Sequence, residues 1–157
     1  MDEREWLERM REAENSLYHV ACAILSGETD RRDAMQETAL RAWEHRRSLR
    51  NEAYFKTWVV RIMVNVCRDL MRKNRRLVPV ETLPDGPAPE SPSDLRLTIE
   101  GLPERLRLPL VLYYLEGYTV EETARALGLP SGTVKFRLHE ARKALRIELD
   151  GEEARAL

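Results

Sequence analysis

The stretch that decides the fold is residues 119–146, which read TVEETARALGLPSGTVKFRLHEARKALR. The pattern predicts a helix, a turn and a second, basic helix, which is the arrangement of a helix-turn-helix. Gly128 suits the left-handed conformation that ends a helix, and Pro130 prevents simple continuation. Ser131 is then predicted to cap the second helix.

The second helix of this motif has two unlike faces. Its predicted buried stripe recurs at helical spacing and consists of Val134, Leu138, Ala141 and Leu145. The opposite side carries Lys135, Phe136, His139, Glu140 and Lys143. A phenylalanine among cations is poorly explained as solvated surface. We therefore expect this face to meet another molecule, with DNA as the first candidate.

Charge is strongly segregated along the chain, although the net charge of the 157 residues is only −1. Residues 41–76 hold 11 Lys and Arg against 3 Asp and Glu, and residues 131–146 hold 5 against 1. Residues 1–15 and 77–101 are acidic. Two basic patches separated by an acidic connector indicate two points of contact with a polyanion. For the run at residues 72–76 alone, an ordinary solvated surface is the alternative.

The rest of the chain is predicted to be helical as well, which makes the fold class all-α. Helices are expected near residues 6–25, 30–47 and 54–75, with Thr29 or Asp30 as the cap of the second. Five of the eight prolines fall within residues 79–92 and predict a flexible linker. We expect two small helical domains, at residues 1–77 and 94–150, joined by a linker at 78–93 and followed by an acidic tail at 151–157.

Two helix faces of the first domain are candidate binding surfaces. On the helix from residue 54, Arg61, Asn65, Arg68 and Arg72 repeat opposite an apolar stripe, and this row together with Lys56 suits a phosphate backbone better than plain surface. The preceding helix exposes Asp33, Gln36, Glu37, Leu40 and Glu44. That acidic face would repel phosphates, which favours a protein partner, with plain solvated surface almost as good an explanation.

Catalytic and metal-binding motifs are not found. There is no glycine-rich phosphate loop and no nucleophile elbow, so we expect no enzyme and no cofactor. Cys22 and Cys67 have no metal-ligand spacing with the histidines and are predicted to be buried, inert thiols. With no apolar run of membrane-spanning length and no signal peptide, a cytoplasmic protein is expected.

Three segments together resemble a known family. Residues 17–21 and 33–43, continued by residues 55–65, are similar to the second conserved region of bacterial sigma factors of the extracytoplasmic-function (ECF) group, in the sigma-70 family. Residues 102–146 resemble the fourth region of the same proteins. The resemblance implies a subunit that directs core RNA polymerase to promoters, and a cognate anti-sigma factor as its inhibitor.

The resemblance also implies roles for individual residues. The core polymerase would be bound by Asp33, Gln36, Glu37 and Leu40. The −10 element would be bound by Arg50, Asn51, Lys56, Arg61, Asn65 and Arg68, with a flipped base held by the loop at residues 49–53. The −35 element would be bound by Ser131, Thr133, Lys135, Phe136, Arg137, His139 and Glu140.

This chain departs from the family at two of those positions. Phe136 stands where the family usually has serine, and Glu140 stands where a basic residue is common. Phenylalanine can pack on a thymine methyl group and glutamate can accept from cytosine N4, so an idiosyncratic −35 sequence is expected. The alternatives are a stand-alone helix-turn-helix regulator, and a scaffold or decoy that occupies polymerase without initiating. The acidic face and the arginine row argue against the first of these, and the basic stripe argues against the second.

Overall fold

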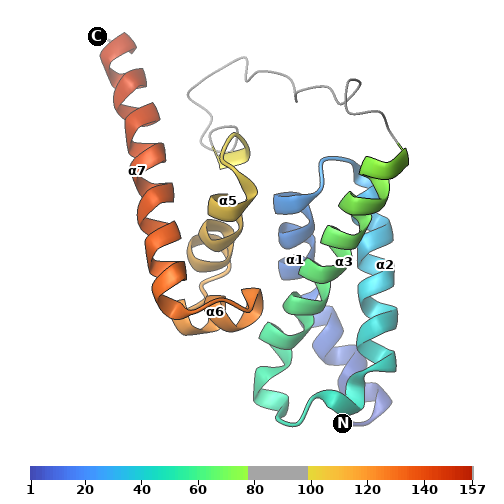
Figure 1. Ribbon diagram of the computed structural model, residues 1–157. Helices are drawn as coiled ribbons and strands as arrows, with labels where there is room; N and C mark the ends of the chain where they lie inside the picture. The colour runs from blue at the N-terminus through green and yellow to red at the C-terminus, as the bar shows by residue number, and fades with distance from the viewer. Residues whose placement is uncertain (78–98, 157) are drawn as a thin grey trace.

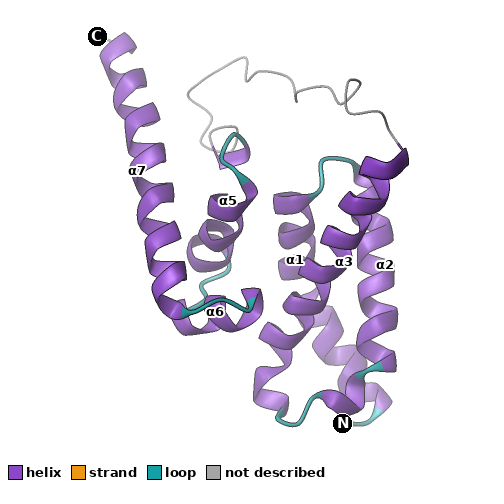
Figure 2. Cartoon of the chain, in the orientation of Figure 1, coloured by secondary structure: helices purple, strands orange, loops and turns teal. Residues whose placement is uncertain are grey.

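The computed structural model describes residues 1–77 and 99–156, with side chains for residues 1–75 and 99–146. Every regular element in those ranges is helical, as the all-α prediction requires (Figure 2). The predicted linker at residues 78–93 lies outside the described residues. Within the described part, none of the helices is both long and apolar enough to cross a membrane.

Three long helices form the first half of the molecule: α1 (Glu3–Ile24), α2 (Glu28–Glu44) and α3 (Phe55–Leu77). They lie side by side as a bundle (Figure 1). Two short 3₁₀ turns, η1 (Arg46–Ser48) and η2 (Glu52–Tyr54), connect α2 to α3. The predicted cap of α2 is wrong: the helix begins at Glu28, and Gly27 occupies the cap position without a side-chain bond. The two acids of that first turn, Glu28 and Asp30, instead favour the helix start through the dipole.

The bundle is held by apolar residues that project inward from each helix. Leu17 and Val20 of α1, and Val59 and Met63 of α3, are at most 1% exposed. Thr38 is the buried polar residue of α2, and its hydroxyl donates to the Met63 sulfur at 3.4 Å. A buried hydroxyl needs such a partner, because an unmade hydrogen bond costs more than a weak one.

The second half contains α5 (Glu104–Leu110), the π-helical turn η4 (Val111–Leu115), α6 (Val120–Leu127) and α7 (Ser131–Ala156). Pro109 lies inside α5, and the chain changes to π-helical hydrogen bonding two residues later, with Glu116 N–H donating to Val111 C=O at 3.0 Å. Since proline removes a helical donor, this change of helix type is the local response to it. The segment at residues 151–157, predicted as a tail, is helical through Ala156.

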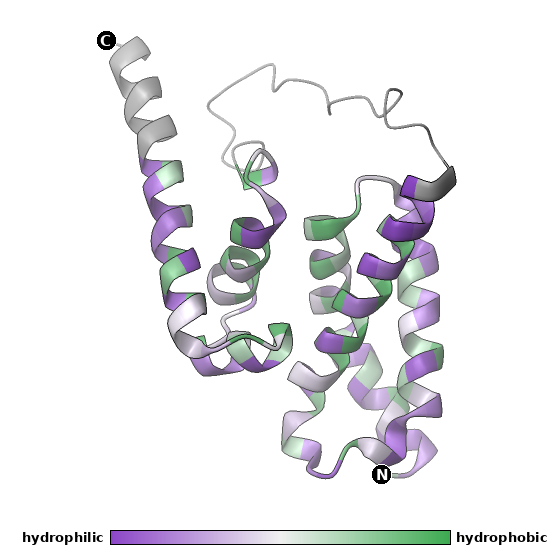
Figure 3. Cartoon of the chain, in the orientation of Figure 1, coloured by the Kyte–Doolittle hydropathy of each residue, from purple (hydrophilic) through white to green (hydrophobic). Residues whose placement is uncertain are grey.

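The two halves pack against each other through one continuous apolar cluster. Leu112, Tyr118 and Leu127 of the second half belong to the same buried cluster as Val59 and Met63 of the first. In Figure 1, α5 and α6 lie between α7 and the α1–α3 bundle, and Figure 3 shows hydrophobic segments of α1 and α5 on the inner part of the molecule. Buried apolar area is the main stabilising term in folding, so this contact favours a compact chain.

Candidate nucleic-acid interface

The turn of the helix-turn-helix is fixed by local chemistry. At the start of α6, Thr119 and Glu122 form a capping box: the Thr119 hydroxyl accepts from Glu122 N–H at 3.0 Å, and the Glu122 carboxylate accepts from Thr119 N–H at 3.1 Å. The bond from Thr119 N–H lowers the pKa of Glu122, with Lys56 adding to the effect. At the other end Gly128 has φ +67°, the left-handed conformation predicted from sequence.

The start of α7 lies one residue earlier than predicted. The Pro130 carbonyl accepts from Thr133 N–H at 3.1 Å and from Val134 N–H at 3.2 Å, so Pro130 is the cap and Ser131 is the first helical residue. Proline can occupy this position because a capping residue needs only a free carbonyl to accept the first helical bond, and proline has one.

The two faces of α7 agree with the predicted pattern. Val134, Leu138 and Ala141 are buried to 1% exposure or less, and Leu145 is half-buried. On the opposite side the Phe136 ring is 61% exposed, which is unusual for so large an apolar side chain. Of the other residues predicted at the −35 element, Lys135 and His139 are exposed, and Ser131, Thr133, Arg137 and Glu140 are half-buried at the edges of the face.

The predicted row on α3 also lies on one exposed side of its helix. Arg61, Asn65 and Arg68 are exposed, while Met63 and Val66 beneath them are buried. Residues that were not part of the predicted stripe, Val60, Val64 and Cys67, are also buried, at 1% exposure or less. The helix is therefore covered over a wider arc than one amphipathic stripe would allow.

The second half of the molecule reaches this row directly. Lys56 Nζ lies 3.2 Å from Glu122 Oε2 and 4.1 Å from the centre of the Tyr118 ring. Arg68 Nε lies 3.7 Å from Glu104 Oε1. The Arg61 guanidinium packs beside Gly128: a Cβ atom added there would lie 3.2 Å from its Nη2. Two members of the row, Arg61 and Arg68, and the nearby Lys56 are thus contacted by residues of the second half.

The loop predicted to hold a flipped base is anchored at both sides. Asn51 Oδ1 accepts from Ala53 N–H at 3.0 Å, which turns the chain into η2. Arg9 of α1 donates to the Glu52 backbone carbonyl at 3.1 Å and ion-pairs with its carboxylate at 3.3 Å. Arg50 is exposed, so this loop presents a cation to solvent while the contacts of Asn51 and Arg9 hold its backbone.

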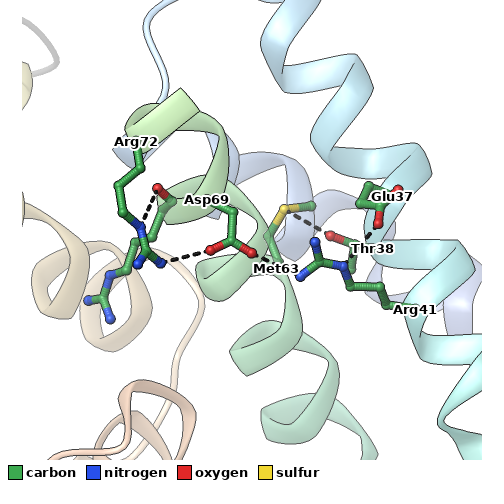
Figure 4. A network of polar contacts seen from close by, with 7 residues as sticks. Glu37, Thr38, Arg41, Met63, Asp69 and Arg72 are labelled. Atoms are coloured by element: carbon green, nitrogen blue, oxygen red, sulfur yellow. Dashed lines mark hydrogen bonds and ion pairs between the residues drawn. The ribbon is translucent and has the colours of Figure 1, made fainter. Parts of the chain in front are cut away.

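The predicted docking face of α2 is split between free and bonded side chains. Asp33, Gln36 and Leu40 are exposed, the leucine at 52%. Glu37 instead binds Arg41 at 2.9 Å, and Arg41 in turn binds Asp69 of α3 at 3.1 Å (Figure 4). The hydrogen bond that Arg41 donates to the Glu37 carboxylate is the main cause of the raised pKa of Arg41.

The same network reaches the end of the arginine row. Asp69, which already binds Arg41, also binds Arg72 at 2.7 Å (Figure 4). These are exposed ion pairs, which contribute about 0–1 kcal/mol each, so the network orients side chains more than it stabilises the fold.

Several residues at the interface were missed by sequence reasoning. Glu104 and Tyr118 carry no pattern that assigns them to a contact with α3, and Glu122 was readable only as a helix cap. Arg125 lies over the Tyr54 ring, 4.2 Å from its centre, and adds another link between the halves. These contacts join residues far apart in sequence, so local periodicity holds no signal for them.

Comparison with known proteins agrees with this geometry. A family model for sigma-70 region 2 matches residues 10–77, and one for sigma-70 region 4 matches residues 93–145. This chain belongs to the sigma-70 family, in its ECF group. The predicted recognition is confirmed, and the match to region 2 distinguishes this sigma factor from a stand-alone helix-turn-helix regulator.

Individual relatives resemble the sigma factor over most of its length. It is 31% identical to the ECF RNA polymerase sigma factor SigE of Mycolicibacterium smegmatis over 90% of the chain, and it spans 60% of that relative. It is 33% identical to the ECF RNA polymerase sigma-E factor of Escherichia coli, with 72% of the chain and 70% of the relative covered. Identity to the RNA polymerase sigma factor SigV of Bacillus subtilis is 29%, with 87% and 86% covered.

Solved structures share the fold. CnrH, solved in complex with the cytosolic domain of CnrY, aligns with a TM-score of 0.73 at 26% identity, over 96% of this chain and 90% of CnrH. RpoE of Bartonella quintana, solved with the anti-sigma factor NepR, aligns with a TM-score of 0.75 at 24% identity, over 94% and 98% of the two chains.

Proposed function

We propose that this sigma factor directs core RNA polymerase to specific promoters for transcription initiation, without catalytic chemistry of its own. The observation that carries the proposal is the outer face of α7, where Lys135, Phe136 and His139 are exposed on the side opposite the buried stripe that begins at Val134. A helix held rigidly by a helix-turn-helix and presenting such a face suits the major groove. Run-off transcription with core polymerase on a broad promoter library tests it, and failure on every template would refute it.

At the −35 element, Lys135, Phe136, His139 and Glu140 would meet base edges, and Ser131, Thr133 and Arg137 would lie nearer the phosphates. The exposed Phe136 ring would pack on a thymine methyl group. Phe136→Ser should therefore shift the −35 sequence selected from a randomised library. Arg142→Ala, a change at an exposed residue of the same helix that is not among those of the outer face, is the control and should leave the selected sequence unchanged.

At the −10 element, the α3 row would hold the unpaired strand, since guanidinium groups bind phosphate and the Asn65 amide can bind a base edge. Arg61→Ala should weaken open-complex formation on duplex promoters. A premelted promoter with a mismatched −10 bubble should recover part of the lost rate, because the cost of unpairing has been removed. Equal loss on both templates would mean that Arg61 acts elsewhere.

The core polymerase would be met by the α2 face, with Asp33, Gln36 and Leu40 as its free side chains and Glu37 held in place by Arg41. Asp33→Arg should weaken core binding. The control is Glu14→Arg, which makes the same charge change at an exposed position of α1. Equal affinity of the two variants for core would show that the docking face lies elsewhere.

We expect the protein to act in the cytoplasm, because polymerase and promoter DNA are found there. The likeness to CnrH, which was solved bound to the cytosolic domain of CnrY, supports an inhibitory protein partner for this chain as well. Co-purification of the tagged chain with the product of a neighbouring gene, and loss of transcription on adding that product, would test for an anti-sigma factor.

A further inference from the structure

We propose that a cleft lined by α3, α5 and α7 binds a small phosphate monoester through the guanidinium groups of Arg68, Arg105 and Arg137. The cleft has a volume of about 320 Å³. Small-molecule sites in proteins usually measure about 300–1,000 Å³, so this cleft suits one small ligand and excludes a length of duplex DNA. The site goes beyond promoter recognition, which gives no role to Arg105.

The three guanidinium groups of the cleft come from three different helices. Arg68 belongs to α3, Arg105 to α5 and Arg137 to α7. Each guanidinium presents a planar fork of N–H donors that matches a pair of phosphate oxygens. Donors on separate helices can reach different oxygens of one phosphate group. A terminal phosphate has three free oxygens for them, whereas a backbone diester has two, so the arrangement favours a monoester.

Two of these cations lack a partner in the protein. The side chains of Arg105 and Arg137 make no hydrogen bond or ion pair with any residue that the structure describes. Arg68 Nε lies 3.7 Å from Oε1 of Glu104, the one carboxylate among the described residues that line the cleft. Three guanidinium groups against one carboxylate leave two positive charges unbalanced. A phosphate monoester carries a charge of about −1.5 to −2 at pH 7 and would balance them, whereas a diester would leave one.

The floor of the cleft is apolar. Leu108 and Leu127 are 2% and 8% exposed, and Pro109 between α5 and the π-helical turn is buried as well. Charges that lie against a buried apolar layer are screened less than charges surrounded by water, so this floor strengthens the attraction between the arginines and an anion. The side chain of Arg68 is 46% exposed, which leaves the mouth of the cleft accessible from solvent.

The site has a consequence for promoter binding. Arg68 is proposed above to bind the −10 strand, and Arg137 to lie near the −35 phosphates. A ligand that occupies both guanidinium groups would compete with the promoter for them. This consequence rests on the proposed function, whereas binding of the ligand itself does not.

The experiment that tests the site is isothermal titration calorimetry on the full-length chain at about 0.15 M salt, where exposed charges are largely screened. The probes are 5′-AMP, 3′,5′-cyclic AMP and inorganic phosphate. Cyclic AMP has the same base and sugar as 5′-AMP but a singly charged diester, and it should bind about tenfold more weakly, as expected for the loss of one charged hydrogen bond. Inorganic phosphate identifies the source of the monoester chemistry: affinity equal to that of 5′-AMP assigns the site to phosphate itself, and weaker affinity assigns it to a nucleotide.

Three variants test which residues hold the ligand. Arg105→Gln should weaken binding of 5′-AMP about tenfold, because it removes one unpaired guanidinium. Glu104→Gln keeps the shape of the carboxylate without its charge and should strengthen binding about threefold. Arg142→Gln is the matched control, since Arg142 is exposed on the same helix as Arg137 but does not line the cleft, and it should leave the affinity unchanged.

Three results would each overturn the site: no binding of 5′-AMP, equal affinity for 5′-AMP and cyclic AMP, or an equal effect of Arg105→Gln and Arg142→Gln. The competition is tested separately by fluorescence anisotropy with a labelled random-sequence duplex. Saturating 5′-AMP should weaken DNA binding by the parent chain and have no effect on the Arg105→Gln chain. If 5′-AMP binds to the parent but does not alter its DNA affinity, the site stands, and the proposed roles of Arg68 and Arg137 at the promoter are wrong.

Discussion

Replacing Gly128 by alanine should destabilise the protein more than the same change at Gly117 or Gly132. Gly128 has φ +67°, where an L-residue with a Cβ atom costs about 1–2 kcal/mol. The added Cβ would also lie 3.2 Å from Arg61 Nη2, a tight contact that the flexible end of an arginine can relieve by a small shift. For a chain of this length, 1–2 kcal/mol corresponds to a loss of about 2–8 °C in Tm.

Two other glycines provide controls for each part of that cost. Gly117 has φ +70° with no heavy atom within 4 Å of an added Cβ, so Gly117→Ala should show the backbone cost alone. Gly132 lies within α7 with open space around it and no positive φ, so Gly132→Ala should stabilise the chain by about 0.4–1 kcal/mol.

Urea unfolding followed by far-UV circular dichroism measures all three variants, and the slope of the transition reports whether the unfolded or native state has changed. The free energy of unfolding should be higher than the parent's for Gly132→Ala and lower for Gly117→Ala and Gly128→Ala. Gly128→Ala should be the least stable, by a few tenths of a kcal/mol. If Gly128→Ala is as stable as Gly132→Ala, the left-handed turn is not what fixes the angle between α6 and α7.

Leu138→Ala should cost about 2–5 kcal/mol in unfolding free energy, because Leu138 is 1% exposed in the helix-turn-helix core, and −35 binding should fall with it in a gel-shift assay. Glu122→Gln should lower Tm at pH 7, and by progressively less as pH falls below 4.5: the pKa of Glu122 is lowered by its bond from Thr119 N–H, so the charge stabilises the fold above about pH 4.5 and that contribution is lost as pH falls through the folded pKa. A thiol reagent should label half-buried Cys22 in the native protein and leave Cys67 unmodified until unfolding, since burial raises the pKa of Cys67 to about 12; labelling of both at equal rates would contradict this.

Much of the fold could be predicted because its causes are local. The stripe of Val134, Leu138 and Ala141 follows from helical period, and the turn at Gly128 follows from the conformation that glycine alone adopts freely. The predicted capping residues were wrong at the start of α2 and at Ser131, where the cap is a neighbouring residue instead. Buried positions such as Val64 were missed, because periodicity within one helix does not reveal how many partners cover it.

The candidate binding residues divide in the same way. The exposed positions of Phe136 on α7 and of Leu40 on α2 agree with the faces predicted from spacing, and their roles at promoter and polymerase stay predictions. The thiols were both predicted to be buried, yet Cys22 is only half-buried because it lies on the rim of a groove between α1 and α5. Whether a residue borders a groove depends on how separate helices pack together, which periodicity within one helix does not reveal.

The sequence by itself determined the helices, their apolar faces, the helix-turn-helix and, through its two matched regions, membership in the sigma-70 family. Only the tertiary structure decided that Lys56 meets Glu122 and that Arg68 meets Glu104, so that part of the basic side of α3 contacts the other half. The physical reason is that helical period fixes which side chains share a face, whereas burial of apolar surface between distant segments fixes what that face touches.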